Sequence, residues 1–240
     1  NVIDNGSTDG TETILSDMSD LFLKSNIEFM FEINSNNIGL SGNIIKLIKK
    51  ASGKYLWLIS DDDIQEPELL LNLYEYITFS NSDILFIPES ISTLSQFLEK
   101  ENNPENQITL PLKLNYNNVI ALDKCCGFLG STIVLSSLLK KSLNKLLETG
   151  FNTQNNYLIK ALNYVAFSSA STRGFFTREL INQNLDEVSY FYGDPQIRID
   201  TFWYGLIEVY RLVNCLDQFC QKKSYMFKLR KKYFENRSYI

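Results

Sequence analysis

The sequence predicts an α/β protein with a doubly wound, mostly parallel sheet, helices on both of its faces, and further helices toward the C-terminal end. Two observations favour this fold class. Residues 1–90 alternate between strand and helix patterns, which is the order that builds a parallel sheet with helical crossovers. The mostly apolar segment 55–60 runs directly into three aspartates, as expected for a strand buried on both faces that ends at a ligand-binding edge.

Periodicity and terminating residues define the individual elements. A polar turn at residues 5–10 opens a helix that ends near Lys24, with Asp9 and Glu12 placed as in a capping box. Gly53 ends one helix, and Pro67 suits the first position of the next. The other predicted helices are 39–51, 67–79, 132–148 and 153–164, with two more within 197–235, and the predicted strands are 27–33, 55–60, 83–87 and 165–169.

Composition excludes several classes of chemistry. The chain of 240 residues contains no histidine, which rules out Ser-His and Cys-His nucleophile pairs and histidine-bound metals. Its four cysteines do not have Cys-x-x-Cys spacing, so a zinc site is not expected. The net charge is −5, although residues 221–240 are strongly basic. That segment either lies on an anionic membrane surface or forms a packed terminal helix with solvated charges, and the acidic remainder argues against nucleic-acid binding.

Asp61, Asp62 and Asp63 are the strongest candidate binding residues. Three neighbouring carboxylates at a strand end repel one another unless a cation lies between them. Oxygen ligands at the carboxyl edge of a sheet indicate Mg²⁺ or Mn²⁺ holding a phosphorylated ligand. The alternative is a solvated acidic turn that caps the helix beginning at Pro67.

Three motifs occur in one order, each after a predicted strand: residues 2–11, residues 37–43, and residues 60–63 followed by Pro67. Together they resemble the nucleotide-binding half of family 2 glycosyltransferases, which have the GT-A fold, of the type that builds bacterial surface polysaccharides. The first strand and helix of that family do not precede Asp4, so we expect an N-terminally truncated chain. The resemblance implies a nucleotide-sugar-binding half at 1–90, an acceptor-binding half of the same domain at 91–180, and a C-terminal helical extension at 181–240.

The resemblance also implies roles for single residues. Asp4 would accept a hydrogen bond from the base of the nucleotide, although a strand-end aspartate that caps the turn at Gly6 explains it as well. Asp61 would face the ribose, while Asp62 and Asp63 would hold the metal. The implied donor-binding residues are Asp4, Asn5, Asn37, Gly39, Asn43 and Asp61.

The acceptor half departs from the family pattern. A Glu-Asp pair usually supplies the general base of inverting transfer, but the best match here is Gln154 and Asn155, which are amides. A base from elsewhere, another register, or a domain that binds without transferring would each explain this. Phe128 and Gly130 would border the acceptor cleft, unless they are ordinary packing residues. The carboxylates considered as base are Glu148, the first choice, and Asp123, Asp186, Glu187 and Asp194.

The expected function is metal-dependent, inverting transfer of a sugar from a nucleotide-diphosphate donor, with UDP favoured. The acceptor would be a saccharide or a lipid-linked saccharide used in surface polysaccharide synthesis. A non-catalytic nucleotide-sugar-binding domain is the main alternative. A nucleotidyltransferase is a third, but the chain lacks the Gly-rich basic loop for a triphosphate. The expected location is the cytoplasm, at the inner face of the membrane.

Overall fold

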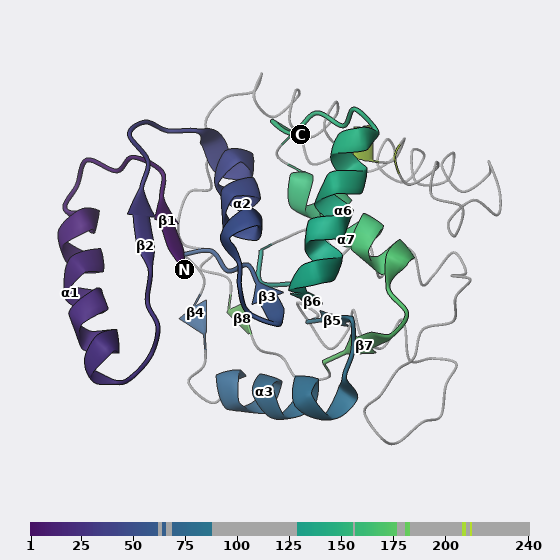
Figure 1. Cartoon of the computed structure of the whole chain (residues 1–240), viewed down its shortest axis with the longest axis horizontal. Coiled ribbons are helices and arrows are strands. Elements are labelled where there is room, and N and C mark those ends of the chain that lie inside the picture. The colour runs from purple at the N-terminus through teal and green to yellow at the C-terminus, as the bar shows by residue number, and fades with distance from the viewer. Residues whose placement is uncertain are drawn as a thin grey trace, which may run out of the picture.

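The computed structural model describes residues 1–61, 64–65, 69–87, 129–155, 157–176, 181–182, 208–209 and 212. Figure 1 shows their arrangement. The helices are α1 (Thr11–Lys24), α2 (Gly39–Lys50), α3 (Leu69–Ser80), α6 (Ser136–Glu148) and α7 (Leu158–Ser169). The strands are β1 (Val2–Asp4), β2 (Phe31–Ile33), β3 (Tyr55–Trp57), β4 (Ile64–Gln65), β5 (Ile84–Phe86), β6 (Thr132–Leu135), β7 (Arg173–Phe175) and β8 (Ile181–Asn182).

The central sheet is mixed, with the strand order β3-β6-β5-β7. Strand β6 runs antiparallel to both β3 and β5, whereas β7 runs parallel to β5. Strands β3, β5 and β7 therefore share one direction, and β6 alone within this sheet is reversed. A separate parallel pair, β1-β2, carries the N-terminal turn, and β4 pairs antiparallel with β8. The predicted α/β class is confirmed.

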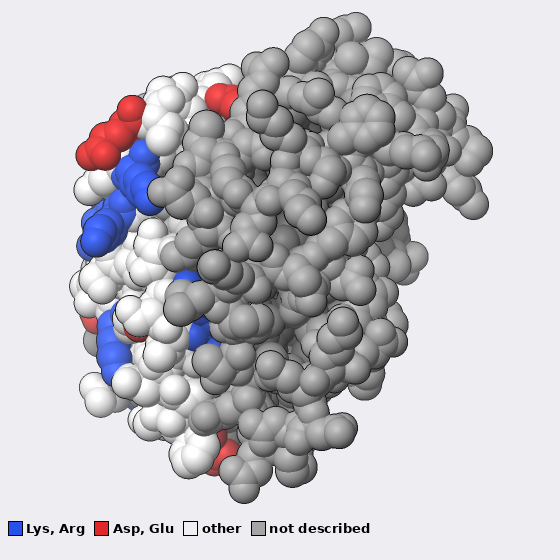
Figure 2. Space-filling view, turned by 90° about the vertical axis from the view of Figure 1, so that its right-hand side faces the viewer, with Lys and Arg blue, Asp and Glu red and all other residues white. Residues whose placement is uncertain are grey.

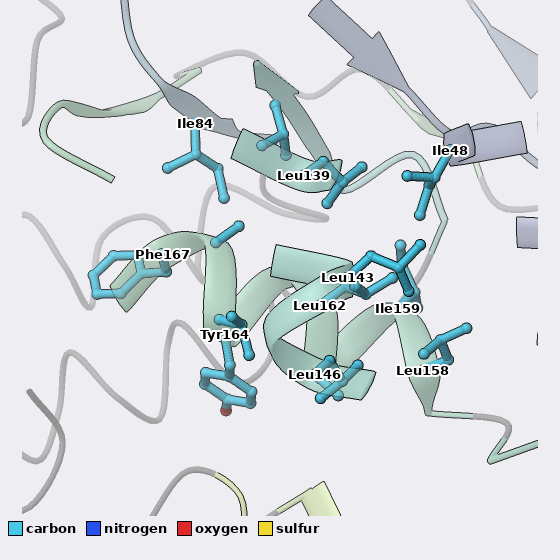
Figure 3. Close-up of a cluster of buried hydrophobic side chains, with 14 of the residues drawn as sticks. Ile48, Ile84, Leu139, Leu143, Leu146, Leu158, Ile159, Leu162, Tyr164 and Phe167 are labelled. Carbon is cyan, nitrogen blue, oxygen red and sulfur yellow. The ribbon is translucent and has the colours of Figure 1, made fainter. Parts of the chain in front are cut away.

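Helices cover both faces of the central sheet because the side chains of β5 alternate between them. Ile84 and Phe86 point into the larger core, which α2, α6 and α7 complete. Figure 3 shows this core, where Leu139, Leu143 and Leu146 of α6 meet side chains of α7. Leu85 packs instead with α3 on the opposite face, the lower one in Figure 1.

Two predicted elements are wrong, for a shared reason. Residues 165–169 form the last part of helix α7 rather than a strand, and residues 132–135 form strand β6 rather than the start of a helix. Helix α7 is buried on every side from Leu158 to Ser168, so it has no polar face to reveal a helical period. Short apolar runs do not distinguish a buried helix from a buried strand.

The predicted capping box is also absent. The residue at the cap of α1 is Gly10, with φ of 87°, and no side chain caps the helix there. Asp9 instead accepts hydrogen bonds from the N–H and hydroxyl of Thr11, and these bonds lower the pKa of Asp9. The helix therefore begins through a local turn, not through Glu12.

The C-terminal region contributes directly to the larger core. Val209 and Leu212 are buried within it, among side chains of α6 and α7. The basic stretch 221–240 lies outside the described residues, so its membrane contact stays a prediction. Figure 2 shows Lys and Arg together with Asp and Glu on the described part of one face. No helix in the described ranges is long and apolar enough to cross a bilayer.

Replacing Phe86 with alanine tests the larger core. Phe86 is fully buried in β5 and contacts the ring of Phe167, with the ring centroids 5.8 Å apart. We expect Phe86→Ala to lower the free energy of unfolding by about 3–5 kcal/mol, measured by urea denaturation. Phe79→Ala is the matched control, because Phe79 is 81% exposed and its loss should change stability by less than about 0.5 kcal/mol. Equal effects of the two changes would contradict this core.

Candidate functional site

The carboxylate of Asp4 closes the turn that follows β1. Its Oδ2 accepts hydrogen bonds from the N–H groups of Gly6, at 3.1 Å, and Ser7, at 2.8 Å, while its Oδ1 accepts one from the Ser7 hydroxyl. The Ser7 hydroxyl is the largest of these influences, and together they hold the pKa of Asp4 below its ordinary value of 3.8. The structure thus shows the turn-capping alternative. A carboxylate has about four lone-pair directions, so this geometry leaves an acceptor for a ligand.

The loops after β1 and β2 are joined by Asn5. Its Nδ2 donates to Asn37 Oδ1 at 2.7 Å, and its Oδ1 accepts from the Ile38 N–H at 2.9 Å. Gly6, with φ of 84°, lies so close that an added Cβ would be 3.2–3.3 Å from backbone atoms of residues 34–37. Only glycine fits this approach without displacing the second loop.

Asn37 connects this loop contact to the start of α2. Its Oδ1 accepts the Gly39 N–H at 2.8 Å as well as the Asn5 amide. Gly39 has φ of 77°, a conformation that glycine adopts without strain. The structure therefore brings Asp4, Asn5, Asn37 and Gly39 together at the N-terminus of a helix, where anions are favoured, and their binding of a donor stays a prediction.

A polar network lies beneath these loops. Asn34, 7% exposed, donates to Asn43 Oδ1 at 2.7 Å and accepts from Lys46 Nζ at 2.6 Å. Asn43 in turn donates to the carbonyl of Ile3 at 3.3 Å. Asn43 thus supports β1 from α2, and a contact of Asn43 with the nucleotide stays a prediction.

Lys46 also forms an ion pair with Glu32, whose pKa is lowered by hydrogen bonds from Lys46 and then from Lys50. The sequence reasoning missed Asn34, Lys46 and Glu32. Asn34 carries one usable signal: it directly follows β2, as Asn5 directly follows β1, and the two strands are parallel and in register.

The acidic segment is described only in part. Asp61 is exposed after β3, whereas Asp62 and Asp63 lie outside the described residues. Within those residues, no three His, Cys, Asp or Glu side chains converge as metal ligands. Gly130, predicted to border the acceptor cleft, lies beside the strand that leads to Asp61. Its N–H donates to Leu58 O at 2.6 Å, and its carbonyl accepts from Trp57 Nε1 at 2.9 Å. Phe128 is also outside the described residues.

Residues 152–155, which we call the amide turn, lie against the start of α2. The carbonyl of Asn155 accepts a hydrogen bond from the Ser41 hydroxyl at 2.9 Å. Gln154 Oε1 is 3.8 Å from the position that a Cβ on Gly39 would occupy. The amide pair predicted at the acceptor side is thus adjacent to the predicted donor side.

Glu208 holds the other side of the amide turn. Its Oε1 accepts the Asn152 N–H at 2.7 Å, and its Oε2 accepts Asn155 Nδ2 at 2.7 Å. Asn155 Oδ1 accepts the Tyr157 N–H at 2.9 Å, which helps to begin α7. Sequence reasoning missed Glu208, and no local pattern marks it, because its partners are 53 and 56 residues away.

Glu148, the first candidate for the general base, is exposed at the last residue of α6. Its side chain makes no hydrogen bond or ion pair with other described residues, and its catalytic role stays a prediction. The other carboxylates considered for this role lie outside the described residues: Asp123, Asp186, Glu187 and Asp194.

Solved structures with a similar fold bind nucleotides. The chain superposes on S. aureus TarS residues 1–349 in complex with UDP, with a TM-score of 0.60 and 17% identity over 90% of this chain and 56% of that one. TarS 1–349 with UDP-GlcNAc gives a TM-score of 0.56 and 15% identity, over 91% of this chain and 61% of that one. The mannosyltransferase PcManGT from Pyrobaculum calidifontis, in complex with GDP-Man and Mn²⁺, gives 0.52 and 10%, over 97% and 69%.

At these identities the likeness shows the GT-A fold, and the chain spans only about three fifths of the TarS 1–349 structures. No curated protein sequence matches the chain. A family model does match it, over residues 2–129, which is more than half of its length. That match includes β1, the two joined loops, α2 and the acidic segment, and the chain belongs to glycosyl transferase family 2.

Proposed function

We propose that this chain transfers a sugar, with inversion, from a nucleotide-diphosphate donor to a saccharide hydroxyl, with the help of a divalent metal. The observation that carries the proposal is the joined pair of loops, which brings Asn5, next to Asp4, against Asn37 at the start of α2, where Gly39 lies beside the amide turn. In this arrangement the joined loops form the proposed donor side, and the amide turn beside the start of α2 forms the proposed acceptor side.

The donor is a UDP-type nucleotide sugar. Asp4 accepts hydrogen bonds from its own turn and has acceptor capacity left for a ring N–H of the base, such as that of uracil. The backbone around Gly39, which has no side chain, allows close approach of the nucleotide at the start of α2. The TarS structures in complex with UDP and UDP-GlcNAc support this choice.

The metal is Mg²⁺ or Mn²⁺. The donor set of the acidic segment fits such an ion, because hard divalent cations prefer carboxylate and phosphate oxygens and take only one or two protein carboxylates. Asp62 and Asp63 would hold the ion, and Asp61 would face the ribose. When bound, the ion supplies neutralisation of the charge on the departing diphosphate. The Mn²⁺ in the PcManGT structure supports this proposal.

The acceptor side consists of the amide turn and the segment at Gly130. Gln154 is exposed next to Gly39 and can donate and accept hydrogen bonds with a sugar hydroxyl. Neither amide of the pair can take a proton from that hydroxyl, so a carboxylate must do so, and Glu148 stays our first candidate. We further propose a lipid-linked saccharide acceptor for surface polysaccharide synthesis at the cytoplasmic face of a membrane, contacted through residues 221–240.

One observation favours a second function, binding of a nucleotide sugar without transfer. The side chain of Asn155 is hydrogen-bonded to Glu208 and to the Tyr157 N–H, and neither position of the amide pair is a carboxylate. Release of UDP from a nucleotide sugar by the full-length protein, abolished by removing Mn²⁺, would reject this second function. Tight UDP binding with no release from any nucleotide sugar in a broad panel would favour it.

Asp62→Asn tests the metal site. The change keeps the size of the side chain but removes one charged ligand, so the ion binds the diphosphate less tightly. We expect UDP affinity in Mn²⁺, measured by isothermal titration calorimetry, to fall by about tenfold or more. Asp17→Asn, an exposed position on α1, is the control and should bind as wild type does. The metal proposal fails if Asp62→Asn retains full Mn²⁺-dependent affinity.

Asp4→Asn tests the base contact and has a defined pH dependence. Because the folded pKa of Asp4 is lowered, its carboxylate stabilises the turn above its ordinary pKa of 3.8 and loses this effect as pH falls through the lower folded value. Affinity for UDP-GlcNAc with Mn²⁺ should therefore show no Asp4-dependent change between about pH 5 and pH 7.

In that same range we expect Asp4→Asn to bind UDP-GlcNAc about tenfold more weakly, since an unpaired polar partner in a binding site costs on the order of 1–3 kcal/mol. Asp20→Asn, exposed on α1, is the control. Unchanged affinity of Asp4→Asn, with a folded protein shown by circular dichroism, would limit Asp4 to closing its turn.

A further inference from the structure

We propose that Glu208 is a positioning residue for the acceptor side of the site: it fixes the amide turn against α2 and leaves donor binding unaffected. The proposal rests on the proposed function for the terms donor and acceptor. It concerns a residue from the region that the sequence assigns to a C-terminal extension.

Glu208 bridges the two ends of the amide turn with one carboxylate. One oxygen accepts from the backbone of Asn152, and the other accepts from the side chain of Asn155, both at 2.7 Å. Hydrogen bonds with a charged acceptor are among the strong ones in proteins. Each end of the turn is therefore held by the same group.

That group is itself anchored. Val209, the next residue, is completely buried in the larger core, and Leu212 is buried there as well. The backbone of Glu208 thus cannot move relative to α6 and α7 without opening the core. Because the core holds the backbone of Glu208, its carboxylate can fix the position of the amide turn. A carboxylate on an exposed loop would instead move together with the turn.

The opposite side of the turn contacts the donor half. Ser41 on α2 donates to the Asn155 carbonyl in a buried hydrogen bond, and Gln154 lies next to Gly39. The turn is consequently held between Glu208 on one side and the first turns of α2 on the other. Displacement of the turn would move Gln154, which lies on the proposed acceptor side, but would leave the Asp4 and Asn5 contacts of the donor side unchanged.

Only a carboxylate meets both hydrogen bonds. In Glu208→Gln, the side-chain oxygen accepts one of them, but the new NH₂ group faces the second donor. Exchanging the two groups restores the match. In the double variant Asn155→Asp/Glu208→Gln, the amide now at position 208 donates to the carboxylate now at position 155 and still accepts from the Asn152 N–H. The carboxylate at position 155 can also continue to accept the Tyr157 N–H.

The experiment compares wild type, Glu208→Gln and the exchanged double variant, with Glu75→Gln as the matched control. Glu75 is exposed on α3, and its substitution removes the same charge. Hydrogen–deuterium exchange reports the Asn152 amide, and isothermal titration reports the affinity for UDP in Mn²⁺. We expect exchange at Asn152 to be about tenfold faster or more in Glu208→Gln, and close to wild type in the double variant and the control.

We expect UDP affinity to stay within about twofold in all four proteins, because the donor-side contacts are separate from the turn. Equal exchange at Asn152 in wild type and Glu208→Gln would overturn the proposal. So would a loss of UDP affinity in Glu208→Gln that the double variant does not reverse, since it would indicate a general role in folding. Absence of UDP binding by wild type would instead reject the proposed function, and the exchange data would still decide whether Glu208 holds the turn.

Discussion

The close contact between the loops after β1 and β2 is the constraint on which the site depends. Gly6 lets the two backbones approach, and Asn5 then bonds both Asn37 and Ile38. Because Asn37 also accepts the Gly39 N–H, the same contact sets where α2 begins. Ser41, half a turn further on, reaches the amide turn. The contact between the loops thus sets the position of α2, while Glu208 holds the amide turn from its other side.

The site residues lie on loops and helix ends, while the position of those loops is set by a mainly apolar core that also buries a few polar side chains, such as Asn163 and Arg173. Strand β5 divides its side chains between two clusters, and α7 is buried along most of its length. Such packing tolerates little displacement. A few polar contacts are therefore enough to place the site residues, because the packed core already fixes most of the position of their loops.

Sequence patterns predicted what is local in this molecule. Asp4, Asn37 and Gly39 belong to motifs at the ends of strands. That they lie near one edge of the sheet could therefore be predicted from the sequence. Helix α7 was partly misassigned because burial on all sides removes its periodicity. Glu208 and the Asn34–Lys46 contact could not be predicted, since they depend on which distant surfaces pack together. The amino-acid sequence of one chain does not show directly which surfaces pack against each other.

The side-chain hydrogen bonds of the network beneath the loops run in one direction, from donor to acceptor. The Lys46 ammonium donates to the Asn34 oxygen, the Asn34 nitrogen donates to the Asn43 oxygen, and the Asn43 nitrogen donates to the Ile3 carbonyl. All three links point the same way, so each dipole reinforces the next. No single amide can be flipped without breaking its neighbours' bonds. The chain of hydrogen bonds begins at Lys46 on α2 and ends at the Ile3 carbonyl on β1, so it joins the helix to the strand whose last residue is Asp4.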